Sequence, residues 1–226
     1  APGSDELKLL DVKIFINSVD SNVSNMNQID ETCFSCGENT KTNLVQVELG
    51  GNHIDHGFHA SLIGNMSDFQ SHIGYLCRNE QYLDTNQTVV HKGKKTNCNM
   101  FIDGTIKDRA TKVYRGTIDM VTGCSGSKGN EMEGTLNLSP DAIEKSAPII
   151  LCGEDDIAAE HGSTVGKLSK DILFYFQARG INQKLAEELL SKAKVIAVAE
   201  KIGDESVQKE IKDSLAKIYG SEYSED

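Results

Sequence analysis

The sequence predicts a mainly β protein with a small α-helical domain at its C-terminal end. Seventeen of the 20 glycines and all twelve threonines lie at or before Gly166, whereas six alanines and a dense mixture of lysine and glutamate follow it. Threonine and glycine favour strands and tight turns, and alanine, lysine and glutamate favour helices. We therefore expect a β core over residues 1–166, with 1–40 its least clearly defined part, and a helical domain over 167–226.

Short apolar or alternating runs recur along the β-rich part and are bounded by Gly, Asn or Asp, as in a series of brief strands. The runs are Leu44–Leu49, Phe58–Ile63, Ile73–Cys77, Thr88–Val90, Met100–Ile102, Thr111–Tyr114, Thr117–Val121, Gly134–Leu138 and Ile149–Cys152. Such a series fits an antiparallel sandwich, or a solenoid whose strands stack into parallel sheets. Sandwich hairpins favour Asn-Gly or Asp-Gly turns, and only Asp103-Gly104 supplies one. This scarcity favours the solenoid.

Three short amphipathic helices are expected after the β core, each preceded by a capping residue. Ser163 or Ser169 can cap the first helix, which ends at Arg179-Gly180, while Asn182 and Asp204 cap the second and third. The apolar positions expected to share a face are Ile172, Leu173 and Phe176, then Leu185, Leu189, Ile196 and Ala199, then Val207, Ile211, Leu215 and Ile218. These stripes either pack on one another and on the β core, or form a docking surface for a partner.

Charge and hydropathy exclude two classes of protein. The formal net charge of −11 argues against non-specific binding of nucleic acid, which requires clustered Lys and Arg. No apolar run exceeds five residues, far from the roughly 20 needed to span a bilayer. The first residues also lack the basic and apolar regions of a signal peptide. We expect a cytoplasmic protein with neither a membrane nor a nucleic acid as partner.

Cysteine and histidine spacing suggests one possible metal site. Cys33 and Cys36 have CxxC spacing, and His53, His56 and His59 follow at intervals of three. One or two of these histidines can complete a Cys2His2-like site with the two thiols. The alternative is that the histidines are solvated or lie in turns, and that most of the six cysteines are buried thiols in a reducing compartment.

The segment from Asp155 to Leu190 resembles the C-terminal region of the SufB/SufD family, the paired scaffold proteins of the SUF iron–sulfur cluster assembly system. The resemblance covers about residues 40 to 190 and is most specific near its end. The matching segments are Asn43–Leu49, Thr88–His91, Met100–Ala110, Tyr114–Ile118, Glu160–Gly166, Leu173–Tyr175 and Arg179–Ile181.

The resemblance implies a right-handed parallel β-helix that acts as a non-enzymatic scaffold. Its edge would pair with a SufB/SufD paralogue or a second copy, and its helices would dock a SufC-type ABC ATPase. The implied ATPase interface comprises Leu173, Phe174, Phe176, Arg179, Gly180, Ile181, Leu185 and Leu189. No nucleotide is expected on this chain, because Gly123–Ser127 lacks the Lys-Ser/Thr of a phosphate loop. Family members carry a further N-terminal segment, so this chain is expected to be a compact variant or a fragment.

The resemblance also implies a transient Fe–S cluster, for which thiolate, imidazole and carboxylate are suitable ligands. His161 matches the family histidine near the proposed cluster interface. The preceding Glu160 matches the Glu-His pair of SufB, whereas the following Gly162 matches the His-Gly pair of SufD. The positions of two family cysteines hold Glu133 and Ala159. The candidate cluster or metal ligands are His161, Glu160, Cys124, Cys152 and Glu133.

Each of these assignments has an alternative. His161 can be a hydrogen-bonded structural residue, and Cys124 and Cys152 can belong to the core. The whole chain can be a degenerate paralogue with a purely structural role. A β-helical enzyme acting on carbohydrate or acyl groups would require clustered carboxylates on one solenoid face.

Overall fold

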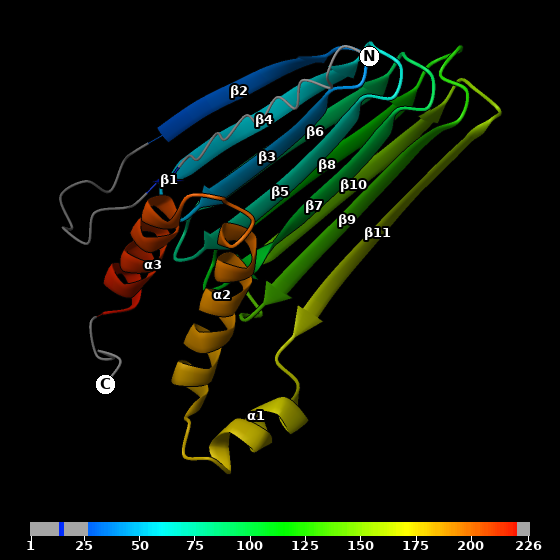
Figure 1. Ribbon diagram of the computed structural model, residues 1–226. Coiled ribbons are helices and arrows are strands. Elements are labelled where there is room, and N and C mark those ends of the chain that lie inside the picture. Colours follow the sequence, from blue (N-terminus) through cyan, green and yellow to red (C-terminus); the bar gives the residue numbers. More distant parts are fainter. Residues whose placement is uncertain (1–13, 16–26, 221–226) are drawn as a thin grey trace.

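The computed structural model describes residues 14–15 and 27–220, which form a parallel β-solenoid of about five turns followed by three helices (Figure 1). One sheet, here sheet A, has the strand order β1-β3-β5-β7-β9-β11, and the other, sheet B, has the order β10-β8-β6-β4-β2. The strands are β1 (Ile14–Phe15), β2 (Asn27–Cys36), β3 (Lys41–Glu48), β4 (His53–Leu62), β5 (Asp68–Cys77), β6 (Tyr82–His91), β7 (Asn97–Ile106), β8 (Thr111–Met120), β9 (Ser127–Asn137), β10 (Ile143–Cys152) and β11 (Ile157–Lys167). The helices are α1 (Lys170–Gln177), α2 (Gln183–Ala199) and α3 (Glu205–Tyr219).

The chain alternates between the two sheets, and every strand pair is parallel. In the middle of the solenoid, Asp68 pairs with Asn97 and Tyr82 with Thr111, so one turn takes 29 residues. Because side chains alternate along a strand, every second residue points between the sheets. Phe34, Phe58 and Phe69 pack there, with ring centroids 5.2 to 6.4 Å apart. The core is therefore a layered stack that continues from turn to turn.

A four-residue turn repeats at successive levels along one side of the solenoid, in Gly37–Thr40, Gly64–Ser67 and Gly93–Thr96. The third residue of each has a left-handed φ of 55 to 59°, and the fourth donates its hydroxyl to the carbonyl of the glycine. A Cβ at Gly64 would lie 2.0 Å from the backbone nitrogen of Glu38 in the turn below. Glycine is thus required where successive turns approach this closely.

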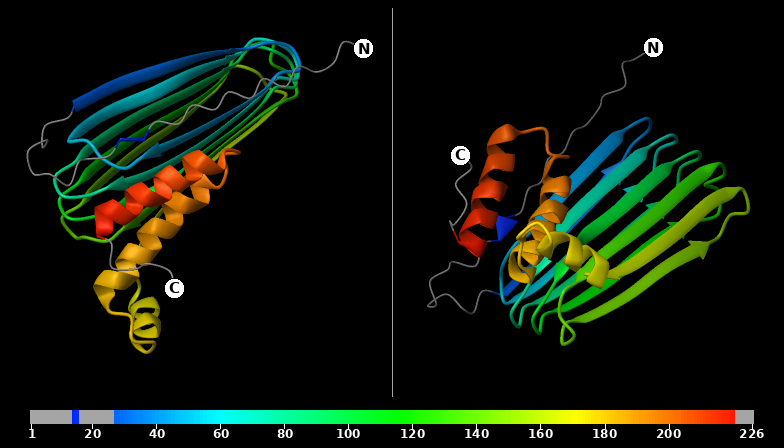
Figure 2. Two further views of the ribbon diagram at one scale, coloured as in Figure 1. Left: turned by 60° about the vertical axis from the view of Figure 1, so that its left-hand side comes forward. Right: turned by 90° about the horizontal axis from the view of Figure 1, so that it is seen from below.

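Helix α2 packs on the outer face of sheet A, against β3, β5 and β7 (Figure 2). Val198 sits over Gly74, where a Cβ would lie 3.0 Å from the valine side chain. Lys194 Nζ lies 2.5 Å from Asp103 Oδ1. Helix α3 adds Ile211 and Leu215 to the same apolar cluster, so sheet A and the two helices share a second core.

The parallel solenoid and the three helices confirm the expected fold class, although several details of the sequence prediction were wrong. The runs 111–114 and 117–121 fall in one strand, β8, which ends at Met120, and Asp103-Gly104 lies inside β7 rather than in a turn. Ser169 caps α1, and Asn182 and Asp204 cap the next two helices as expected. Leu189 is 42% exposed because the buried face of α2 is formed instead by Ala186, Ser191, Val195, Val198 and Ala199. None of the helices in the described part of the chain combines the length and apolar character needed to cross a membrane.

Candidate functional site

The last turn of the solenoid is open. Strands β10 and β11 form the edges of the two sheets, and most of their residues are exposed or half-buried. The inner side of this turn is polar, because the inward positions of β8, β9, β10 and β11 carry several charged and hydroxyl side chains. They are Lys112, Tyr114, Glu131, Glu133, Thr135, Glu144, Ser146, His161 and Ser163. We call this set the terminal-turn cluster.

A buried lysine lies at the base of the terminal-turn cluster. Lys112 Nζ forms an ion pair with Glu133 Oε1 and lies 3.5 Å from Glu144 Oε1. It also faces the rings of Tyr75 and Tyr114, at 5.4 and 5.2 Å from their centroids. Both members of the Lys112–Glu133 pair are almost completely withdrawn from solvent. Desolvation of such a pair is costly unless further hydrogen bonds satisfy its remaining atoms.

Serine hydroxyls from the two edge strands satisfy the second oxygen of Glu133. Ser146 on β10 and Ser163 on β11 both donate to Glu133 Oε2, the latter at 2.8 Å. Burial would raise the pKa of Glu133, but Lys112 and the two serines more than offset it and hold the pKa below its ordinary value. Burial raises the pKa of Glu144, with Lys112 opposing and Glu133 adding to the shift. The cluster therefore contains one carboxylate that is held ionised, Glu133, beside a second carboxyl group, Glu144, that holds its proton more tightly than a glutamate in water does.

A third carboxyl group, Glu131, lies beside Glu133 on the same face of β9. Its side chain extends across the interior to Gly116 on β8 of sheet B. A Cβ added to Gly116 would lie 2.1 Å from Glu131 Oε1 and 2.4 Å from the Tyr114 hydroxyl oxygen, so both side chains lie against this glycine. Burial raises the pKa of Glu131, while the nearby Tyr114 hydroxyl and His161 act in the opposite direction. Three carboxyl groups against one lysine give this interior an excess of negative charge whenever all are ionised.

The structure brings together only some of the predicted cluster ligands. Glu133 lies in the terminal-turn cluster, and His161 pairs in register with Glu131 at its exposed rim. Glu160 points to the outer face of sheet A, because neighbouring residues of a strand alternate. Cys124 is buried in the turn between β8 and β9.

Cys152 is exposed at the end of β10 but remote from His161. Ser146 and Ser163 share Glu133 and so face each other across the solenoid. From that level, Cys152 lies four residues further than His161 along the strand direction, toward the turn between β10 and β11, which is about 13 Å at ~3.3 Å per residue. The two side chains do not meet.

The four residues of the other predicted metal site are also apart. Cys33 is exposed on the outer face of β2, whereas Cys36 is buried and contacts Thr42 Oγ1. His53 is exposed and lies 3.2 Å from Asp55, and His56 is buried with Nδ1 3.4 Å from Glu48. CxxC spacing places two thiols on opposite faces when it falls within a strand. Within residues 14–15 and 27–220, no three His, Cys, Asp or Glu side chains form a group that could hold a metal ion.

Sequence reasoning missed a buried cysteine–histidine pair and the lysine of the terminal-turn cluster. His91 Nε2 lies 3.2 Å from Cys98 Sγ, and His91 Nδ1 lies 2.7 Å from Thr96 Oγ1. Burial lowers the pKa of His91 to about 4 and raises that of Cys98 to about 12, so both are neutral at pH 7. The alternation of side chains along β8 could have predicted that Lys112 is buried, because Lys112 lies on the same inward-facing side of the strand as Tyr114.

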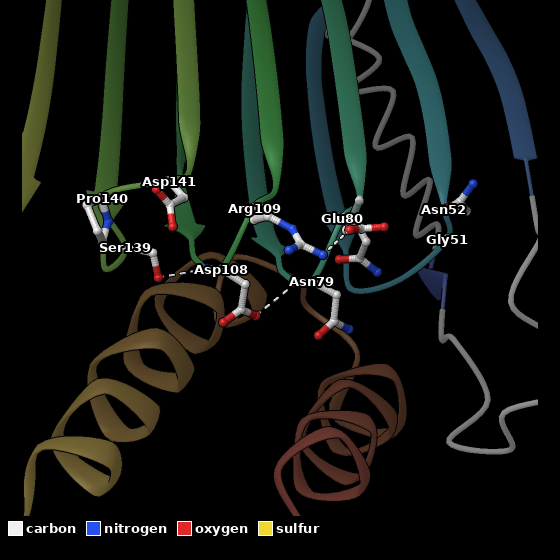
Figure 3. A pocket seen from close by; sticks show the side chains of 10 residues that line it. Gly51, Asn52, Asn79, Glu80, Asp108, Arg109, Ser139, Pro140 and Asp141 are labelled. Carbon is white, nitrogen blue, oxygen red and sulfur yellow. Dashed lines mark hydrogen bonds and ion pairs between the residues drawn. The ribbon is translucent and has the colours of Figure 1, made fainter.

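A groove crosses successive turns along the side of the solenoid opposite the Gly37–Thr40 turn (Figure 3). It has a volume of about 830 Å³ and includes Glu80, Asp108 and Asp141 among its lining residues. Glu80 forms an ion pair with Arg109, and Asp108 accepts a hydrogen bond from the backbone nitrogen of Asn79 at 2.9 Å. Two of its three carboxylates thus serve to join neighbouring turns, which gives little support to a carbohydrate-processing enzyme.

The predicted ATPase interface lies on α1, the loop after it and the start of α2. None of the residues of α1 is buried, and Phe174 and Tyr175 are 72% and 56% exposed. The Arg179 guanidinium lies 4.2 Å from the centroid of the Tyr175 ring, and Gly180 has a φ of 79° in the turn that leads to Ile181. Leu173, Phe176, Ile181 and Leu185 are half-buried between these segments. The helix therefore presents aromatic side chains away from both cores.

The fold and the sequence together define the class of protein. Residues 12–194 match the family described as "SUF system FeS cluster assembly, SufBD core domain", so the chain belongs to the SufBD family of the SUF iron–sulfur cluster assembly system.

Individual relatives show the same kinship. The chain is 29% identical over 134 residues to the iron–sulfur cluster assembly protein SufD of Bacillus subtilis, covering 59% of this chain and 31% of that protein. It is 24% identical over 170 residues to SufD of Escherichia coli, covering 75% of this chain and 40% of that protein. It is 27% identical over 150 residues to the chloroplastic SufBD family protein ABCI8 of Arabidopsis thaliana, covering 66% of this chain and 27% of that protein. The matched region is thus well under half the length of each relative.

Proposed function

We propose that this chain is a non-enzymatic scaffold subunit that docks a SufC-type ABC ATPase through α1 and the start of α2. The observation that carries this proposal is the exposed aromatic surface of α1, which contributes no residue to either core. Helix α1 is nevertheless defined at both ends, by the Ser169 cap and by Gly180. A well-formed helix with an unburied apolar face is typical of a partner-binding element.

The docking proposal is tested with Phe174→Ser and a purified SufC-type ATPase in a quantitative binding assay. An aromatic anchor contributes about 2 kcal/mol or more at an interface, so the affinity should fall about thirtyfold. Ile29→Ser is the matched control, because Ile29 is 85% exposed on β2 in sheet B, whereas α2 packs on sheet A. Equal affinities for wild type and Phe174→Ser would overturn the proposal.

The open last turn supports the second part of the proposal, that the solenoid edge pairs with another SufBD subunit or a second copy. Edge strands with unpaired backbone groups are templates for further strands. Ile149 and Leu151 on the outer side of β10 are 46% and 49% exposed. Their replacement by lysine should weaken association in analytical ultracentrifugation, and an unchanged association constant would contradict this pairing.

For the transient Fe–S cluster, this chain offers His161 and carboxylates at the open turn, together with exposed Cys152 at a distance. The missing thiolates would then come from the paired subunit. Anaerobic reconstitution of the complex with iron and sulfide should give less chromophore with His161→Ala. Unchanged cluster content in a variant lacking His161, Cys33 and Cys152 would favour the alternative of a degenerate, purely structural paralogue.

A further inference from the structure

A small basic pocket lies where the turns of the solenoid meet the helices. It has a volume of about 210 Å³ and is lined from the solenoid by Arg78, Asn79, Lys107 and Asp108, and from α2 and α3 by Lys184, Glu188, Ile218 and Tyr219. It lies next to the groove of Figure 3 and shares Asn79 and Asp108 with it. Three cationic side chains thus converge in a protein whose net charge is −11.

The three cations have no ion-pair partner in the described part of the chain. Among residues 27–220, no ion pair joins a carboxylate to Arg78, Lys107 or Lys184. The two carboxylates that line the pocket, Asp108 and Glu188, have other partners. Asp108 accepts from the Asn79 backbone nitrogen at 2.9 Å, and Glu188 pairs with Lys192 at 2.6 Å. Three cations against these two carboxylates leave the pocket lining with a formal net charge of +1.

Arg78 is the most constrained of the three cations. Its Nε atom is buried and has no hydrogen-bond partner in the structure. Burial lowers the pKa of the Arg78 guanidinium, an effect that Tyr219 and Asp108 only partly offset. A charged group that is desolvated without a partner is unfavourable, and an anion with suitable acceptors would remove that cost.

We propose that this pocket binds a small oxyanion with the chemistry of inorganic phosphate. The planar guanidinium supplies parallel donors that match phosphate oxygens, and the two lysines add charge from opposite sides of the pocket. The volume of about 210 Å³ is below the ~300 Å³ at which pockets for larger organic ligands begin. The buried Tyr219 hydroxyl lies in the same wall, and burial raises its pKa so that it keeps its proton.

The bound anion would join two parts of the fold. Arg78 and Lys107 belong to solenoid turns, whereas Lys184 lies in the first turn of α2 and Tyr219 in the last turn of α3. A ligand that binds only when these parts are together stabilises their association by mass action. Phosphate should therefore hold the helices onto the solenoid.

The proposal is tested by calorimetric titration of the whole chain with inorganic phosphate, at an ionic strength held constant with chloride. We expect saturable binding at one site and slower hydrogen exchange at the start of α2 and the end of α3. Removal of a charge-assisted hydrogen bond should lower the affinity about tenfold or more in Arg78→Gln, and severalfold in Lys184→Gln. Lys145→Gln, an exposed lysine on β10, is the control and should bind normally.

A second variant, Lys184→Gln, and a comparison of phosphate with ADP and ATP make the test decisive. Lys184 is exposed, so Lys184→Gln folds normally and remains informative if Arg78→Gln is unstable. Lack of saturable phosphate binding, or equal affinities for wild type, Arg78→Gln and Lys184→Gln, would overturn the proposal. Tighter binding of ADP or ATP than of phosphate would also overturn it, because the ligand would then be a nucleotide. The assay contains no ATPase, so its outcome is independent of the proposed docking function.

Discussion

Lys112 and Glu133 form an ion pair inside the solenoid, one from each sheet, and both side chains are almost completely withdrawn from solvent. The pair lies one turn below the open end, and the serines that complete it come from the two exposed edge strands. In addition to the pairing of β10 with β8 and of β11 with β9, the Glu133 carboxylate thus links side chains of both edge strands to the buried Lys112.

Removal of one member of this pair should be strongly destabilising. Lys112→Met leaves the Glu133 carboxylate buried without its cation, and we expect the free energy of unfolding to fall by about 3 kcal/mol or more. The double variant Lys112→Met/Glu133→Leu should recover most of this loss, because two apolar side chains need no charge compensation. Urea denaturation of the single and double variants measures both values. Additive losses in the double variant would show that the two residues do not act as a pair.

The pKa of Glu131 predicts a pH dependence of stability. Burial raises this pKa, so the folded protein binds the Glu131 proton more tightly than the unfolded chain does. The resulting stabilisation is complete below the unfolded carboxyl pKa of about 4.3 and is lost as the pH rises through the folded pKa.

Glu131→Gln removes this titration while leaving a group that can hydrogen bond to Tyr114. Relative to wild type, the variant should become progressively more stable as the pH is raised from about 4.3 towards neutrality. Denaturation midpoints measured across this range test the prediction, with Glu160→Gln on the outer face of β11 as the control. A stability difference that does not change with pH would rule out the assigned titration.

The repeating strands and the helix caps could be predicted from the sequence because they depend on local spacing and on single residues such as Ser169. The partners of Lys112 could not, since Glu133 is 21 residues away and Ser163 reaches the same carboxylate only through the stacking of turns. The buried face of α2 was mispredicted for a similar reason. Its apolar residues occupy more than one side, and the small Gly74 on sheet A selects the side with Val198.

The close approach of two strands at Gly104 makes this position intolerant of any side chain. A Cβ there would lie 2.3 Å from the backbone carbonyl oxygen of Tyr75, which cannot move without disturbing β5. Gly104→Ala should therefore destabilise the fold by about 1–3 kcal/mol, as overpacking of a core does. Gly203→Ala is the matched control, because within the described part of the chain no atom beyond the two neighbouring residues lies within 4 Å of its Cβ position. Equal thermal stabilities of these two variants would contradict the proposed close packing.

Accessibility divides the six cysteines into two groups that differ in their reactivity. Cys33 and Cys152 are exposed, whereas Cys36, Cys77, Cys98 and Cys124 are buried. Burial raises the pKa of both Cys77 and Cys98 to about 12, which keeps them as unreactive thiols at pH 7. Iodoacetamide should thus modify Cys33 and Cys152 first in the native protein, and the other four only after denaturation.

Peptide mapping by mass spectrometry measures this order of modification. The result bears on cluster assembly, because a thiol that does not react with a small alkylating reagent is equally closed to iron from solution. If Cys98 is modified in the native protein as fast as Cys152, the solenoid opens readily, and its buried thiols become possible ligands. If Cys98 is protected, the thiolates that this chain can offer to a cluster are confined to Cys33 and Cys152.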